Sequence, residues 1–161
     1  MSAIGRPVAE SADTLRDGLV HMNEVQLAST YAAGESIAIP GGRSRGIALL
    51  FPNSGLTPAL ALVSRIVWQG KVVDPARGRL VNRVFGFPLI PAKVYEGESW
   101  FDDGRAIIID YADTSSTFFY MRDEVRRIAD GLWLGRSYYR NGARGKYVLT
   151  FAMDFTASSR R

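Results

Sequence analysis

The sequence predicts a mainly β protein, with about eight antiparallel strands that form a barrel or a strongly curved sheet behind an N-terminal helical segment. From Ile66 onward, short apolar runs alternate with turn signals, which is the pattern of successive strands. Dipeptides that tolerate positive φ separate several of these runs and suit tight hairpins. They are Asp103-Gly104, Asp130-Gly131 and Asn141-Gly142. Because hairpins join consecutive runs, the neighbouring strands should be antiparallel.

Residues 7–31 are predicted to be helical. Val8, Ala12, Leu15, Leu19 and Met22 recur at steps of four and three, so they share one helix face. The helix should stop at Gly34, and two shorter helices are an alternative interpretation of the same stretch. Residues 40–46 form a Gly- and Arg-rich loop.

The first strand is predicted at 47–51, and Thr57-Pro58 then begins a short helix, 57–63, between the first two strands. The remaining predicted strands are 65–73, 79–85, 89–96, 105–111, 117–128, 132–140 and 145–155. In the last of them, large apolar side chains alternate with smaller or polar ones. Closing such a sheet into a barrel would remove exposed strand edges.

A length of 161 residues predicts one domain, 1–161. It would consist of a helical lead-in at 1–34, the barrel at 45–155 and a frayed tail at 156–161. Hydrophobic residues make up 47% and charged residues 22% of the chain, which is typical of a globular protein. No apolar run is long enough to span a membrane.

Composition excludes several kinds of chemistry. The chain has no cysteine, so disulfides, thiolate nucleophiles and zinc–thiolate sites are ruled out. The single histidine, His21, lies outside any metal-binding or triad motif, and we expect neither a metal nor a cofactor. The absence of cysteine and of a visible signal peptide is compatible with a cytoplasmic protein, which we predict. The net charge is +4, but the arginines are scattered, so nucleic acid is not an expected partner. The sequence is also compatible with a homodimer.

A helical lead-in followed by about eight antiparallel strands with tight turns resembles the calycins, the group of lipocalins and fatty-acid-binding proteins. The resemblance covers residues 45–155 and is one of architecture. Lipocalins carry Gly-x-Trp at the first strand, whereas this chain has Trp68-Gln69-Gly70-Lys71, with the glycine after the tryptophan. The resemblance implies a cavity for a small, largely apolar ligand.

The candidate site residues are polar or aromatic side chains on the predicted strands. Carboxylates in an apolar cavity are candidates for acid–base catalysis, and tyrosines for proton donation. The catalytic candidates are Asp110, Asp123, Glu124, Tyr111 and Tyr138. The candidates for cavity wall or ligand orientation are Trp68, Lys71, Arg83, Lys93, Phe119, Arg122 and Trp133. Alternation alone does not say which strand faces point inward, and ion pairs on the surface would give the same pattern.

Three functions follow as hypotheses. The first is binding of a small hydrophobic metabolite with a polar or anionic head inside the barrel. The second is a cyclase, isomerase or lyase on the same scaffold, acting without a metal through carboxylate and tyrosine groups. The third is a protein-interaction subunit. A cavity above ~300 Å³ with a buried carboxylate would favour the first two, and a core filled with side chains would favour the third.

Overall fold

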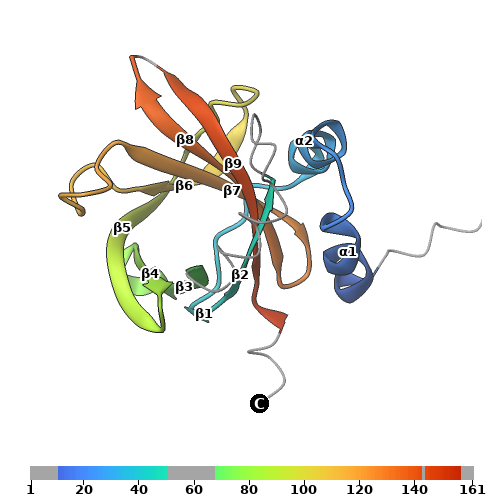
Figure 1. The fold of residues 1–161 in the computed structure, drawn as a ribbon, viewed down its shortest axis with the longest axis horizontal. Coiled ribbons are helices and arrows are strands. Elements are labelled where there is room, and N and C mark those ends of the chain that lie inside the picture. The colour runs from blue at the N-terminus through green and yellow to red at the C-terminus, as the bar shows by residue number, and fades with distance from the viewer. Residues whose placement is uncertain (1–10, 51–67, 143, 157–161) are drawn as a thin grey trace, which may run out of the picture.

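The computed structural model describes residues 11–50, 68–142 and 144–156, with the side chains of Leu50 and Trp68 outside the description, and it shows a nearly closed antiparallel barrel (Figure 1). The nine strands of the described residues are β1 (Gly42–Arg43), β2 (Arg45–Leu50), β3 (Trp68–Asp74), β4 (Arg79–Val84), β5 (Phe87–Glu98), β6 (Arg105–Asp110), β7 (Met121–Ala129), β8 (Leu132–Asn141) and β9 (Arg144–Asp154). Their order in the sheet is β1-β3-β4-β5-β6-β7-β8-β9-β2. The predicted fold class is confirmed.

The barrel closes through the segment 42–50, which carries both β1 and β2. β1 pairs with β3 and β2 pairs with β9, so one stretch of chain bridges the two ends of the hairpin series. At the corner between them, the Ser44 amide donates to the Lys71 carbonyl at 2.8 Å, and the Lys71 amide donates to the Ser44 hydroxyl at 3.1 Å. A side chain on Gly70, whose φ is +107°, would meet the Ser44 carbonyl oxygen at 2.2 Å, so only glycine permits this closure.

The strands follow the predicted ranges with two differences. β1 was not predicted, since two residues carry no alternation, and the expected loop at 40–46 is wrong because it contains β1 and the start of β2. β7 begins at Met121 instead of residue 117, because residues 116–120 form a turn. In that turn the Phe118 amide donates to the Ser115 hydroxyl at 3.0 Å, and the Met121 amide donates to the Phe118 carbonyl at 2.9 Å. The predicted short helix at 57–63 lies outside the described residues.

The N-terminal segment forms two helices, α1 (Ala12–Leu19) and α2 (Glu24–Ala33), which is the alternative interpretation of that stretch. Asn23 starts the second helix through a capping box: its side chain accepts from the Gln26 amide, and the Gln26 side chain accepts from the Asn23 amide, both at 2.9 Å. This cap favours a new helix start over continuation of the first. Gly34 ends α2, as predicted.

Two apolar clusters hold the fold together. The first fills part of the barrel interior, and its fully buried members include Leu80, Ile109, Val125 and Met153. The second lies between the helices and the outer face of the barrel, which α1 and α2 cover in Figure 1. Its members include Leu19, Leu27, Tyr31, Leu134 and Ala152. Strands β7 to β9 are therefore buried on both faces. Among the described residues, no helix has the length and apolar character needed to cross a bilayer.

Candidate ligand-binding site

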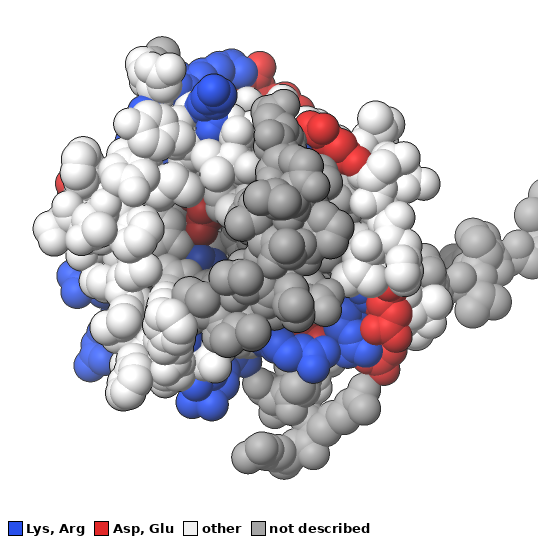
Figure 2. Space-filling model, in the orientation of Figure 1, with Lys and Arg blue, Asp and Glu red and all other residues white. Residues whose placement is uncertain are grey.

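A cavity of about 240 Å³ lies inside the barrel. It is smaller than the ~300 Å³ expected for a ligand-binding barrel. Apolar side chains make up most of its wall, and Lys71 and Asp123 are its charged members. The lining residues are Ala48, Lys71, Asn82, Val84, Ile90, Tyr111, Phe118, Met121, Asp123, Ser137, Leu149 and Phe151. Figure 2 shows a hollow on this side of the molecule with an acidic and a basic group at its bottom. The predicted strand alternation thus produces an interior that side chains do not fill completely.

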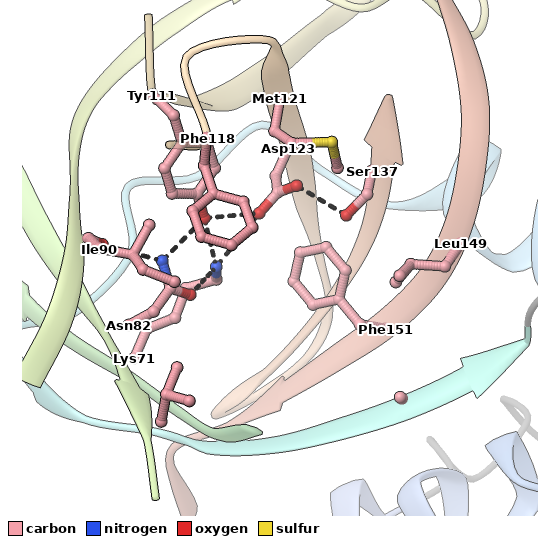
Figure 3. Close-up of a pocket in the computed structure, with 12 residues that line it drawn as sticks. Lys71, Asn82, Ile90, Tyr111, Phe118, Met121, Asp123, Ser137, Leu149 and Phe151 are labelled. Carbon is pink, nitrogen blue, oxygen red and sulfur yellow. Dashed lines mark hydrogen bonds and ion pairs between the residues drawn. The ribbon is translucent and has the colours of Figure 1, made fainter. Parts of the chain in front are cut away.

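The polar groups of the cavity gather at one wall. Nζ of Lys71 lies 3.1 Å from Oδ2 of Asp123 and 2.8 Å from the hydroxyl oxygen of Tyr111. The Tyr111 hydroxyl lies 2.9 Å from the same carboxylate oxygen. Figure 3 shows these three polar ends, which come from β3, from β7 and from the residue after β6, pointing toward one another. All three residues are at most 5% exposed, so the ion pair is removed from water.

Two neutral residues complete the cluster. The Asn82 Oδ1 atom accepts from Nζ of Lys71 at 2.6 Å, while its Nδ2 atom donates to the Ile90 carbonyl and to the Tyr111 hydroxyl, at 3.1 and 3.0 Å. The Ser137 hydroxyl donates to Oδ1 of Asp123 at 2.6 Å. Both oxygens of the Asp123 carboxylate are therefore held in place. A buried charge pair is tolerated in a protein when it is paired and hydrogen-bonded in this way.

Burial tunes the proton affinity of this cluster. It lowers the pKa of the Lys71 amine, an effect that the negative charge of Asp123 opposes. Burial and the neighbouring Asp123 carboxylate raise the pKa of the Tyr111 hydroxyl well above its usual value. Lys71 can therefore lose its proton more readily than a lysine in water, and Tyr111 stays protonated as a hydrogen-bond donor.

Irregularities of the sheet concentrate around the cavity. Five strand pairs of the described residues contain a register shift, and four of these lie beside cavity residues. The first three of these register shifts lie at Gly70 just before Lys71, after Ser137, and after Ala48. The fourth leaves Ile90 as an extra residue opposite Val81 and Asn82, with a φ of +58° that a β-branched residue rarely adopts. Bulges and strained residues accumulate near functional sites, so this wall has the features of one.

Of the predicted site residues, Lys71, Tyr111 and Asp123 come together at the cavity wall. Trp133 faces the barrel interior, but it packs in the apolar core, where its indole nitrogen donates to the Ile37 carbonyl at 3.2 Å. Phe119 does not reach the cavity: it lies in the turn before β7 and is 55% exposed. Trp68 lies in β3, and its side chain is outside the described residues.

The other candidates point away from the cavity. Arg83 lies between the cavity residues Asn82 and Val84, so it faces the opposite side of β4. Lys93 forms an exposed ion pair with Asp113 at 2.8 Å. Asp110 accepts hydrogen bonds outside the barrel from Tyr95 and Arg140, at 2.7 and 2.5 Å.

Glu124 belongs to a separate, structural cluster on the outer face of the barrel. Its carboxylate is fully buried and accepts from the Tyr31 hydroxyl of α2 at 3.0 Å and from the Ser99 hydroxyl at 2.6 Å. It also pairs with Arg122 at 2.9 Å. Tyr138 lies on the same face, where its hydroxyl accepts from Nε of Arg136 at 3.1 Å. These residues join α2 and the loop after β5 to the barrel wall, so they do not act in the cavity.

Sequence reasoning missed Asn82 and Ser137. Asn82 had a recognisable signal, because it is an amide between Leu80 and Val84 on the apolar face of its strand. Ser137 stands directly across from Asp123 in the β7–β8 pair, but that register is not readable from the sequence.

The fold and the cavity define a small antiparallel β-barrel with an internal polar cluster. No known protein-family model matches the sequence, and no curated protein is significantly similar to it. Among solved structures, the chain is similar to a protein from Thermomonospora curvata, with a TM-score of 0.57 and 16% sequence identity. The match covers 88% of this chain and 95% of that one. At this identity, the likeness concerns the fold alone.

Proposed function

We propose that the barrel binds a small, largely hydrophobic molecule whose polar group docks on the Lys71–Asp123–Tyr111 cluster. The observation that carries the proposal is the cavity of about 240 Å³, which has an apolar wall and a single concentration of polar groups. Binding pockets for small molecules combine these two properties. The architectural resemblance to calycins, which hold apolar ligands inside a barrel, supports the same function.

The charge balance of the cluster favours a neutral polar head. Lys71 and Asp123 neutralise each other at 3.1 Å, so the wall offers no net positive charge to an anion. A carboxylate head would have to compete with Asp123 for the amine and would bring an additional negative charge into a buried site. A carbonyl or hydroxyl head would instead exchange hydrogen bonds with Tyr111, Asn82 or Lys71. A neutral polar head group is therefore preferred to an anionic one.

Acid–base catalysis in the same cavity is the second candidate. The observation that favours it is the sharing of one carboxylate oxygen: Oδ2 of Asp123 contacts both the Lys71 amine and the Tyr111 hydroxyl. A proton can pass between these groups without leaving the cavity. The catalytic groups of a metal-free isomerase, cyclase or lyase would then be Asp123 and Tyr111, with Lys71 beside them.

Displacement of the fluorescent apolar amine N-phenyl-1-naphthylamine tests binding. We expect octan-1-ol to displace it from the wild-type protein more effectively than octanoate, which has the same chain length but an anionic head. Ala48→Phe places a ring inside the cavity and should weaken probe binding at least about tenfold, a loss of roughly 1.4 kcal/mol. Ala32→Phe, on the exposed side of α2, is the matched control.

Absence of probe binding to the folded wild-type protein would contradict the proposal, as would equal binding by the Ala48→Phe variant. Native mass spectrometry of protein purified from its own host adds an independent measurement. A retained small molecule that Ala48→Phe no longer carries would identify the ligand class.

A further inference from the structure

Among the described residues, one lysine is enclosed by the wall of an apolar cavity. A lysine amine in such surroundings can react with carbonyl compounds to form an imine. We propose that the polar head of the ligand is an aldehyde or ketone, and that Lys71 binds it covalently as an imine. The inference rests on the proposed function and deepens it by naming the class of ligand.

The surroundings of Lys71 differ from those of the other two lysines of the chain. Lys93 and Lys146 are exposed to water, whereas Lys71 is 2% exposed and ends in the cavity. Burial lowers the pKa of the Lys71 amine, which increases the fraction present as the nucleophilic free base. A carbonyl carbon held in the cavity would therefore meet a more reactive amine than it meets at the surface.

Asp123 supplies the base and the counter-ion that imine formation needs. Its Oδ2 atom lies 3.1 Å from Nζ, and Ser137 fixes the second oxygen at 2.6 Å. Transfer of one ammonium proton to Asp123 frees the nitrogen lone pair. The protonated imine retains one N–H, which can donate to the ionised Asp123 and keep the buried charges paired.

The atoms of the step balance without a co-reactant. The amine attacks the carbonyl carbon, so that a C–N bond forms and the carbonyl π electrons move to oxygen. That oxygen gains the proton held by Asp123 through the Tyr111 hydroxyl, which lies 2.8 Å from Nζ and 2.9 Å from the Asp123 carboxylate. The nitrogen carries two hydrogens after the attack, and one of them passes to the same oxygen by the same route. The C–O bond then breaks, the nitrogen lone pair forms C=N, and water leaves. Two hydrogens of the original ammonium group depart in this water, and the third stays on the imine nitrogen.

The resting hydrogen bonds are consistent with this exchange. Asn82, Tyr111 and Asp123 place three acceptors within 3.1 Å of Nζ, which matches an ammonium with three N–H bonds. Imine formation removes two of those N–H bonds. Tyr111 and the amide of Asn82 are then available to the ligand, while Asp123 remains with the nitrogen.

Reductive trapping tests the inference on the wild-type protein. Incubation with hexanal or hexan-2-one and sodium cyanoborohydride converts an imine into a stable secondary amine. Peptide mass mapping then locates the hexyl group on one of three lysines or on the N-terminal amine. We expect Lys71 to be modified about tenfold faster than Lys93 or Lys146 at neutral pH, because the cavity holds the carbonyl carbon beside Nζ. Ala48→Phe should reduce labelling of Lys71 to the level of the exposed lysines.

Hexan-1-ol separates failure of this inference from failure of the proposed function. If hexan-1-ol displaces the fluorescent probe while hexanal labels only the exposed amines, the covalent inference is wrong and the binding function stands. If neither compound enters the cavity, both are wrong. Lys71→Met should abolish trapping at this site. Should that variant fail to fold, the wild-type map together with Ala48→Phe still decides the question.

Discussion

The carboxylates of Asp123 and Glu124, which are neighbours in the sequence, lie on opposite sides of the barrel wall. Asp123 pairs with Lys71 inside the cavity, and Glu124 pairs with Arg122 beneath α2. Both are almost completely buried. One strand therefore supplies an acidic group to two separate polar clusters, one suited to a ligand and one that attaches a helix and a loop to the barrel.

Replacement of Glu124 should affect stability and leave the cavity unchanged. Glu124→Gln removes the buried partner of Arg122 and should lower the free energy of unfolding by about 3 kcal/mol. Glu96→Gln is the matched control, because Glu96 forms an exposed pair with Arg105 that is worth at most about 1 kcal/mol. Urea unfolding measures both effects. A variant of normal stability that no longer binds the fluorescent probe would contradict this assignment.

Replacement of Asp123 should make stability depend on pH in the neutral and mildly alkaline range. In Asp123→Asn, Lys71 loses the charge that opposes the lowering of its pKa by burial. The unfolded chain then holds a proton that the folded protein releases, so the free energy of unfolding should rise with pH until the pH reaches the unfolded pKa of lysine, about 10.4. Near neutral pH, the variant should be about 3–5 kcal/mol less stable than the wild type.

Urea unfolding at a series of pH values checks the Asp123 prediction. Asp113→Asn, which removes the exposed partner of Lys93, serves as the control and should leave the profile close to that of the wild type. A flat profile for Asp123→Asn would show that Lys71 finds another anionic partner or reaches water.

The buried tyrosines should limit stability in alkali. Burial raises the pKa of Tyr31, Tyr138 and Tyr147, and it raises the pKa of Tyr111 as well. Their contribution to stability is complete below the unfolded pKa of about 10 and is lost as the pH rises toward the folded pKa values. Tyrosinate absorbance from these groups should therefore develop together with the loss of the circular-dichroism signal. Full ionisation of these tyrosines while the protein remains folded would contradict the prediction.

Two glycine substitutions should change stability in opposite directions. A Cβ on Gly135 would lie 2.3 Å from Cζ of Phe151, a ring of the cavity wall, so Gly135→Ala should cost about 1–3 kcal/mol. Displacement of that ring should also weaken probe binding. Gly18→Ala in α1 meets nothing within 4 Å and should stabilise the protein by about 0.5–1 kcal/mol. Thermal unfolding measures both. Similar shifts for the two variants would contradict the packing described here.

Local sequence signals located most of the elements. Asp130-Gly131 and Asn141-Gly142 connect β7, β8 and β9, as predicted, because Gly131 and Gly142 adopt positive φ. Gly34 ends α2, while the capping box at Asn23, which divides the helical segment, went unrecognised. The turn before β7 was missed because Phe118 and Tyr120 have the composition of a strand.

Alternation and turn dipeptides were enough to predict the antiparallel strand series and to place Asp123 and Glu124 on opposite faces of their strand, since alternation with period two is a local property. Which of the two faces is the interior depends on how the strands pack in three dimensions. Strands β7 to β9 contact the apolar core of the barrel on one side and the helices on the other, so hydrophobicity does not distinguish the two faces. The bulges at Gly70 and Ile90, together with closure at Ser44, bring Lys71 and Asn82 to Asp123. Those contacts depend on pairing between residues far apart in the chain, for which no local pattern exists.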